Sequence, residues 1–474
     1  MPRPGVDVSL LDTPGSVVSI PTDTGTWFVA GLTDMGPLTA QQVLSLDDFV
    51  TKFGARQAYS VLYDSVQTFF REGGDKMYVA RVVGPGATSG THNLLDGAAA
   101  IALTATAIGP GAWSANYKVV VAAGGGSGTF VIRVTDTPGN ILEDSGDLID
   151  NDAAVQWSQT SKYIRLSLGA SALDPAVAAG AALSAGTDDR TNITDTQWLS
   201  ALNTFTSDLG PGQVSSPGRT STNGHTQLVD HAEDHNRVAL LDLTDSGTSS
   251  TLISNIAASR FAAAFAPWIK IPGLVAGSFR TVPPSALIAG LVARNDPVYG
   301  SNHASAGRFG LSRYAVGLSQ SDWDDATRAT LNAAGVDVIR ILYGTVTVYG
   351  WRSTVNANTD PNWIDFGNAR QYTKLSAELN QVGQNYVFED IDGQDGRTIG
   401  GFHDVLAGVL MEHYNSRQLF GSTPDEAFSV DTGPSVNTLT NIANLELNAV
   451  CYVKMSPFAE HVAIQIVKRS VTEV

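Results

Sequence analysis

Cysteine is almost absent from this chain of 474 residues, because Cys451 is the only one. A single cysteine excludes an internal disulfide framework, so we expect synthesis in a reducing cytoplasm. The opening MPRPGVDVSL lacks the basic and then apolar pattern of a signal peptide. No charge occurs in residues 97–117, but Pro110 and several glycines and threonines interrupt that stretch. We therefore predict strands and turns there, and no membrane insertion.

Positive charge is also scarce. The chain has 29 Lys and Arg against 46 Asp and Glu, a formal net charge of −17. A surface for nucleic acid or for an anionic membrane needs basic residues, so we expect no direct contact with nucleic acid. Hydrophobic residues make up 43% and charged residues 16%, which is typical of a folded chain. The length predicts about three domains.

The common catalytic motifs are missing as well. The sequence contains no P-loop Gly-Lys-Ser/Thr, no G-x-S-x-G elbow and no S-x-x-K. The GGGSG at 124–128 lacks the spacing and the following helix of a dinucleotide-binding loop, so it predicts a hairpin turn. We predict that the protein is not an enzyme, with no catalytic residue and no cofactor.

Two polar stretches are candidate metal sites. His231 and His235 stand four apart in HTQLVDHAEDHNR, but Glu233 comes one position later than in a metalloprotease motif. A polar helix face is the favoured interpretation. In EDIDGQDG, residues 389–396, Asp395 occupies the position at which an EF-hand needs glycine, and a solvated acidic turn is favoured. We expect no metal site.

Hydrophobic periodicity indicates an α/β unit near the start of the chain. The segment TWFVAGL predicts a buried strand, and MYVARVV predicts a second one. Between them, Leu62, Val66 and Phe69 fall on one helical face. Gly73 and Gly74 are expected to end that helix. Strand, helix and strand in this order favour an α/β fold.

The sequence pattern changes over residues 86–190, where short segments rich in Ala, Thr, Gly and Ser predict an inserted all-β domain. The α/β texture returns after it, with a helix expected over 250–268 and another opened by Pro283 and Pro284. Two longer helices are predicted beyond residue 360, within 366–382 and 398–420.

Both ends of the chain alternate between apolar and polar residues, the pattern of half-buried strands. The apolar residues of these segments are Val6, Val8, Leu10, Val462, Ile464 and Ile466. We predict that AEHVAIQIVKRS, residues 459–470, pairs in a hairpin with NAVCYVKM, on whose apolar face Cys451 would be a buried structural thiol. A hairpin alone is marginal in water, so other strands must cover its edges.

Several segments resemble one family, the contractile tail sheath proteins of bacteriophages and related injection machines. These segments are PGVDV near the start, TGTWFVAGLTDMGPL with VQTFFREGGDKMYVARV, ATAIGPGAW, LNAAGVDVIRILYGTVTVYGWRST, QLFGSTPDEAFSV and SPFAEHVAIQI. The most specific match is residues 262–307, with Pro267-Trp268, Pro283-Pro284-Ser285 and Ala289-Gly290 in the family order. The segments follow one another as they do in that family.

The resemblance implies a structural subunit that polymerises helically, in stacked hexameric rings, around a tail tube. It implies contraction that drives the tube through a cell envelope for genome delivery, and contacts with baseplate and tail terminator proteins. In such sheaths the terminal arms add strands to a sheet in neighbouring subunits. The implied location is the virion tail, after synthesis in a host bacterial cytoplasm. The alternatives are a bacterial injection system or phage-tail-like bacteriocin and, from another class, an α/β hydrolytic enzyme with a site near residues 225–235.

The predicted fold is α+β and multi-domain. An α/β core domain carries the inserted all-β domain, and a C-terminal α+β domain is completed by strands exchanged between subunits. The predicted parts are an N-terminal arm at 1–20, the core at 21–85 and 191–355, the outer insertion at 86–190, and the inner sheath domain with its donated strand at 356–474.

Overall fold

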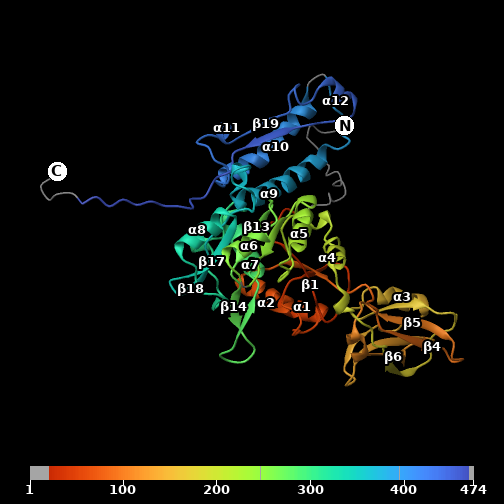
Figure 1. Cartoon of the computed structure of the whole chain (residues 1–474). Helices are drawn as coiled ribbons and strands as arrows, with labels where there is room; N and C mark the ends of the chain where they lie inside the picture. The colour runs from red at the N-terminus through yellow and green to blue at the C-terminus, as the bar shows by residue number, and fades with distance from the viewer. Residues whose placement is uncertain (1–20, 246, 394–395, 469–474) are drawn as a thin grey trace, which may run out of the picture.

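The computed structural model describes residues 21–245, 247–393 and 396–468, and an eight-stranded sheet lies at the centre of the molecule (Figure 1). Its strand order is β18-β17-β13-β12-β11-β1-β3-β2. The six inner strands are parallel, and the two edge strands run antiparallel to their neighbours. The strands are β1 (Trp27–Gly31), β2 (Gln41–Val43), β3 (Met77–Arg81), β11 (Gln213–Ser215), β12 (Val238–Asp242), β13 (Ala262–Ala266), β17 (Val336–Leu342) and β18 (Thr345–Val348).

Helices cover both faces of this sheet. One face carries α1 (Leu46–Phe53), α2 (Leu62–Glu72), α7 (Ser285–Tyr299) and α9 (Phe366–Gly383). The other face carries α4 (Asp195–Leu202), α5 (Thr222–Asp234), α6 (Ser249–Ser254) and α8 (Asp325–Ala333). Successive residues of β1, such as Trp27 and Phe28, enter the two opposite cores. Strands buried on both faces are apolar throughout, which is why the sequence shows continuous runs here.

The helix expected over 250–268 is wrong. Helix α6 ends at Ser254, and residues 262–266, with the sequence AAAFA, form the fully buried strand β13. A short apolar run fits a buried strand and a buried helix equally well by its pattern. Pairing with β12 and β17 on either side decides for the strand. The helix expected after Pro283 and Pro284 is confirmed, since α7 starts directly after Pro284.

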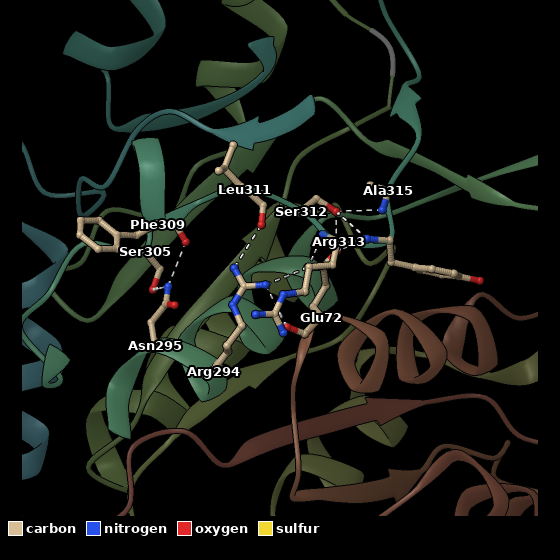
Figure 2. A network of polar contacts seen from close by, with 10 residues as sticks. Glu72, Arg294, Asn295, Ser305, Phe309, Leu311, Ser312, Arg313 and Ala315 are labelled. Carbon is tan, nitrogen blue, oxygen red and sulfur yellow. Dashed lines mark hydrogen bonds and ion pairs between the residues drawn. The ribbon is translucent and has the colours of Figure 1, made fainter. Parts of the chain in front are cut away.

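Helices α2 and α7 are joined by a buried polar network (Figure 2). Glu72 is fully buried, and its carboxylate accepts hydrogen bonds from the Ser312 hydroxyl and from the Arg313 N–H at 2.9 Å. Arg294 of α7 lies 3.6 Å from the same carboxylate and donates to the Leu311 carbonyl. A buried carboxylate is tolerated because these donors satisfy it. The network holds the loop after α7 against α2.

Residues 91–182 form a lobe beside the main sheet (Figure 1). It contains the sheets β4-β5-β9 and β10-β6-β7-β8, which share a hydrophobic core. The strands are β4 (Thr91–Leu95), β5 (Ile101–Ala107), β6 (Tyr117–Ala123), β7 (Phe130–Asp136), β8 (Ile141–Asp144), β9 (Ile164–Leu168) and β10 (Ala178–Ala182). The hairpin predicted around 124–128 is confirmed, since β6 pairs with β7. The all-β prediction is wrong, because Asp150 caps the helix α3 (Asn151–Ser158), which packs on β9.

Two adjacent chain crossings connect this lobe to the core. The Gly84 N–H donates to the Asp188 carbonyl at 2.8 Å, so the outgoing and returning segments are bonded to each other. The guanidinium of Arg81, at the end of β3, donates to the Pro110 carbonyl at 2.6 Å. Burial lowers the pKa of Arg81 to about 10. The attachment is therefore fixed by buried hydrogen bonds.

The C-terminal part packs above α9, with α10 (Arg397–Asn415), α11 (Pro424–Ala427) and α12 (Leu439–Ala443) (Figure 1). The two long helices beyond residue 360 are confirmed. A two-stranded sheet joins β19 (Phe428–Asp431) and β20 (Val450–Val453). The predicted terminal hairpin is wrong, because β20 pairs with β19, which precedes it by about one helix and two loops, and not with residues 459–468.

A small three-stranded sheet, of β14 (Ile269–Pro272), β15 (Phe279–Val282) and β16 (Gly317–Leu318), lies at the edge of the core. None of the helices in the described ranges has the length and apolar character needed to span a bilayer.

Candidate assembly site at the C-terminal arm

The C-terminal arm, which we define as residues 459–468, is bonded to the core at its root. Just before it, Phe458 packs against the main hydrophobic core. The carboxylate of Glu460 accepts hydrogen bonds from two guanidinium nitrogens of Arg352, one of them Nε at 2.9 Å. The amide of Asn332 donates to the same carboxylate at 2.9 Å. A bidentate arginine–carboxylate pair fixes geometry as well as distance, so the start of the arm has a defined position.

One buried and one partly buried acid, Asp337 and Asp365, lie beside this ion pair. Asp337 is fully buried and accepts a hydrogen bond from the Arg352 N–H at 2.8 Å. Burial raises the pKa of Asp337 well above its ordinary value, and burial raises that of Asp365 to about 7. Partial burial alone would raise the pKa of Glu460, but the hydrogen bonds from Arg352 and Asn332 outweigh it and lower the pKa. Arg352 therefore stabilises the charged form of Glu460.

Beyond Glu460 the arm extends away from the body of the molecule (Figure 1). No hydrogen bond joins residues 461–468 to the rest of the described chain. The exposed fractions of Val462, Ile464 and Ile466 are 72%, 81% and 94%. Exposed branched apolar residues on an unpaired segment mark an interaction surface. The N-terminal residues predicted to act in the same way, Val6, Val8 and Leu10, lie outside the described residues.

The sheet of β19 and β20, also in the C-terminal part, is small. Within the described residues it has two strands, and a two-stranded sheet is marginal without further cover. Tyr452 on β20 is 59% exposed, and Phe420, which lies beside the sheet, is 62% exposed. Cys451 on β20 is half-buried rather than buried, and burial raises the pKa of its thiol. The thiol is therefore protonated at neutral pH, which opposes a nucleophilic role.

The polar helix face predicted at His231 and His235 is wrong for His231. That side chain is 4% exposed, because this face of α5 packs on the sheet. Its Nε2 lies 2.8 Å from the Arg237 guanidinium. Burial and then the Arg237 charge lower the pKa of His231 to about 3. A neighbouring cation opposes metal binding at the same nitrogen, so the pair has a packing role.

The acidic turn caps a helix. The carboxylate of Asp392 accepts hydrogen bonds from the Gly396 N–H at 2.7 Å and from the Thr398 N–H at 3.2 Å, at the start of α10. Glu389 and Asp390 are exposed, in agreement with a solvated turn. The capping role of Asp392 was not predicted, although an acid shortly before a helix is its usual signal. Over the part of the chain that the structure describes, three or more metal-ligating side chains gather nowhere.

The sequence matches no protein-family model and no curated protein. Solved structures do match. The helical sheath protein of the anti-feeding prophage in its contracted state has a TM-score of 0.60 at 16% identity, covering 98% of this chain and 99% of that one. The sheath tail protein of Listeria innocua has a TM-score of 0.62 at 11% identity, covering 87% of this chain and 89% of that one. A sheath protein of an extracellular contractile injection system in its contracted state has a TM-score of 0.57 at 14% identity, covering 99% and 98%.

The chain has the contractile tail sheath fold. Because the likeness extends over nearly the whole length, it includes the lobe at 91–182 and the C-terminal part as well as the core. Baseplate structures of the anti-feeding prophage are among the matches too. In this chain the arm and the two-stranded sheet both lie in the C-terminal part.

Proposed function

We propose that this protein is the structural subunit of a contractile sheath. It polymerises helically, in stacked hexameric rings around a tail tube, and contracts to drive the tube through a cell envelope. Baseplate and tail terminator proteins are its partners at the two ends. The location is a virion tail, or the sheath of a bacterial injection system or phage-tail-like bacteriocin. The sheath fold supports this proposal, and so does the position of the C-terminal arm.

The observation that carries the proposal is the contrast within the arm. Its root at Glu460 is bonded to the core, whereas Ile464 and Ile466 are exposed and the backbone after 460 has no partner in the described chain. Such a segment is suited to add a strand to a neighbouring subunit's small sheet. We propose that Val462, Ile464 and Ile466 are the buried face of that donated strand, with Val6, Val8 and Leu10 acting in the N-terminal arm.

The ion pair at the root gives the arm a mechanical role. A strand that links two subunits during contraction must transmit force from its partner into its own core. The Arg352–Glu460 pair and the packed Phe458 ring are the points at which this force enters the core. Rigid bodies would then reorient while the strand links hold, as in other transitions between two lattice states.

Negative-stain electron microscopy of the purified full-length protein tests this function. We expect rings or tubes of uniform diameter that increase with protein concentration, because several arms must engage at once. Bound zinc and hydrolytic activity in a uniform monomer would instead support the enzyme alternative near residues 225–235. That outcome would contradict the sheath role.

A further inference from the structure

A cleft lies at the point in the main sheet where the order of strand addition reverses, between β1 and β11. From β1 the chain moves to the neighbouring β3, whereas from β11, on the other side of β1, it moves outward to β12 and β13. The connecting helices α2 and α5 therefore lie on opposite faces of the sheet. Where two such connections diverge, a crevice forms outside the carboxyl ends of the strands. Open α/β sheets bind small ligands at this position.

The cleft has a volume of about 330 Å³, at the small end of the range for ligand pockets. Residues that line it include Gly31, Tyr59, Val61, Trp198, Arg219 and Trp268. The Trp268 indole N–H already donates to the Leu243 carbonyl at 2.7 Å, so this residue offers its apolar ring to the cleft. Three aromatic side chains in the lining favour a flat ligand.

The cleft also contains an arginine with unused hydrogen-bonding capacity. The Arg219 side chain is 7% exposed, and its Nη2 is 2.5 Å from the Asp195 carboxylate. Its guanidinium carbon lies 5.1 Å from the centre of the Trp198 ring. The other terminal nitrogen, Nη1, is buried and has no hydrogen-bond partner among the described residues. A buried N–H without an acceptor is costly, so this one is suited to a ligand oxygen.

Two further features add positive potential. Helix α2 begins at the cleft after Val61, and the Ser60 hydroxyl caps it by accepting the Leu62 N–H at 3.1 Å. The helix dipole adds positive potential at this end, and the Asp64 carboxylate of the first turn is paired with Arg56 and Arg280. Arg190 lies over the Tyr59 ring at 3.6 Å, with a side chain that is 39% exposed and paired with Asp188.

We propose that this cleft binds a small organic anion with a flat apolar body. The anionic group accepts a hydrogen bond from Arg219 Nη1 on the side of the cleft where α2 begins, and the rings of Trp198 and Trp268 cover the flat part. The site is formed by one subunit, and its existence does not depend on the sheath role. It is a ligand site in addition to the assembly surface of the arm.

The test uses the full-length unassembled protein and the probe 1-anilinonaphthalene-8-sulfonate. We expect one probe molecule per chain, with quenching of tryptophan fluorescence. Arg219→Gln should weaken its binding at least about tenfold, since bonds to charged groups are the strong ones. Arg133→Gln is the matched control, because Arg133 also pairs with an aspartate but lies in the 91–182 lobe. The control should bind as the parent does.

A neutral analogue, N-phenyl-1-naphthylamine, separates charge from apolar contact. It should bind more weakly than the anionic probe and respond little to Arg219→Gln. Val61→Phe fills the cleft while leaving Arg219 in place, so it should abolish binding of both probes. If Arg219→Gln does not fold, this variant tests whether the probe binds in the cleft. Equal binding by the parent and all three variants would place the probe on exposed apolar surface and overturn the proposal. Equal affinity for the neutral and anionic probes would overturn it as well.

Discussion

Three carboxylates near Arg352 differ in their contacts and in the direction of their pKa shifts. Glu460 is paired with the guanidinium, whereas Asp337 is buried, Asp365 is partly buried, and both have raised pKa values. Asp365 also caps α9, since its Oδ1 accepts the Gly367 N–H at 2.7 Å. Its Oδ2 is buried without a partner in the described residues. The arm root therefore depends on a balance of charge that neutralisation of one acid can change.

Asp365→Asn tests this balance. Burial raises the pKa of Asp365 from 3.8 to about 7, so between these values the folded chain holds a proton that the unfolded chain has lost. This group therefore contributes most stability below about pH 4, and its contribution falls as the pH rises to 7. The variant cannot ionise and keeps the capping oxygen. We expect it to be more stable than the parent at pH 8, by roughly 1–3 kcal/mol, and similar to it at pH 4.

Urea unfolding of the unassembled protein at pH 4, 6 and 8 measures the effect. The exposed Asp390→Asn is the control and should change stability equally at all three values. If the difference between parent and Asp365→Asn is the same at pH 4 and pH 8, the buried acid is not the source of the pH dependence.

The arm is the element on which assembly depends in this proposal. Its alternation places Val462, Ile464 and Ile466 on one side and His461 and Gln465 on the other. All are exposed in the single subunit, so substitutions there cannot disturb a core within the same chain. An effect on assembly can thus be separated from an effect on folding.

Ile464→Lys and Gln465→Lys form a matched pair. Both add one positive charge to the arm, but only the first places it on the face proposed to be buried by a neighbour. Burying an unpaired charge should weaken each link by about 3 kcal/mol, so we expect Ile464→Lys to lose ordered tubes and Gln465→Lys to retain them. Electron microscopy detects the tubes, and thermal melting of the monomer should be unchanged in both.

Removal of residues 459–474 should also give a soluble, cooperatively folded subunit and no ordered sheath, with a modest loss of stability because the Arg352–Glu460 ion pair is removed as well. A sharp fall in melting temperature together with normal tubes would mean that the arm pairs within its own chain.

At the scale of the whole molecule, the 91–182 lobe has a core of its own and two adjacent connections to the main sheet. The C-terminal arm and the β19–β20 sheet lie away from this lobe, beyond the main sheet (Figure 1). We therefore propose that the segment 86–190 decorates a sheath lattice without holding it together. The hydrogen bonds between its two connecting segments fix it to the rest of the subunit.

Replacement of residues 86–190 by a short Gly/Ser linker tests this division. We expect a folded subunit that still forms tubes, narrower than those of the parent. Arg81 loses its Pro110 acceptor but keeps the carbonyls of Gly36 and Asp34, so the deletion should cost only about 1 kcal/mol at this site. Melting temperature and tube diameter are the measurements. A deletion variant that folds but never forms tubes would show that this segment holds the lattice.

Local structure was determined by the sequence itself. The helix of residues 62–72, its end at Gly73 and the hairpin at 124–128 follow from spacing and from glycine. These features depend on residues within one or two turns of each other, so their patterns are visible along the chain. The α/β core was predicted for the same reason. The resemblance to sheath proteins also depends on short local segments that follow one another in a fixed order.

Only the tertiary structure decided what distant residues do. It made AAAFA a strand by placing β12 and β17 on its two sides, and it paired β20 with β19 in place of the arm. It also brought Arg352 to Glu460 across 108 positions, a pairing for which the spacing holds no signal. Burial and cross-strand hydrogen bonds join residues that are far apart in the chain. The arm left without such bonds in its own subunit is the surface that we propose for its neighbour.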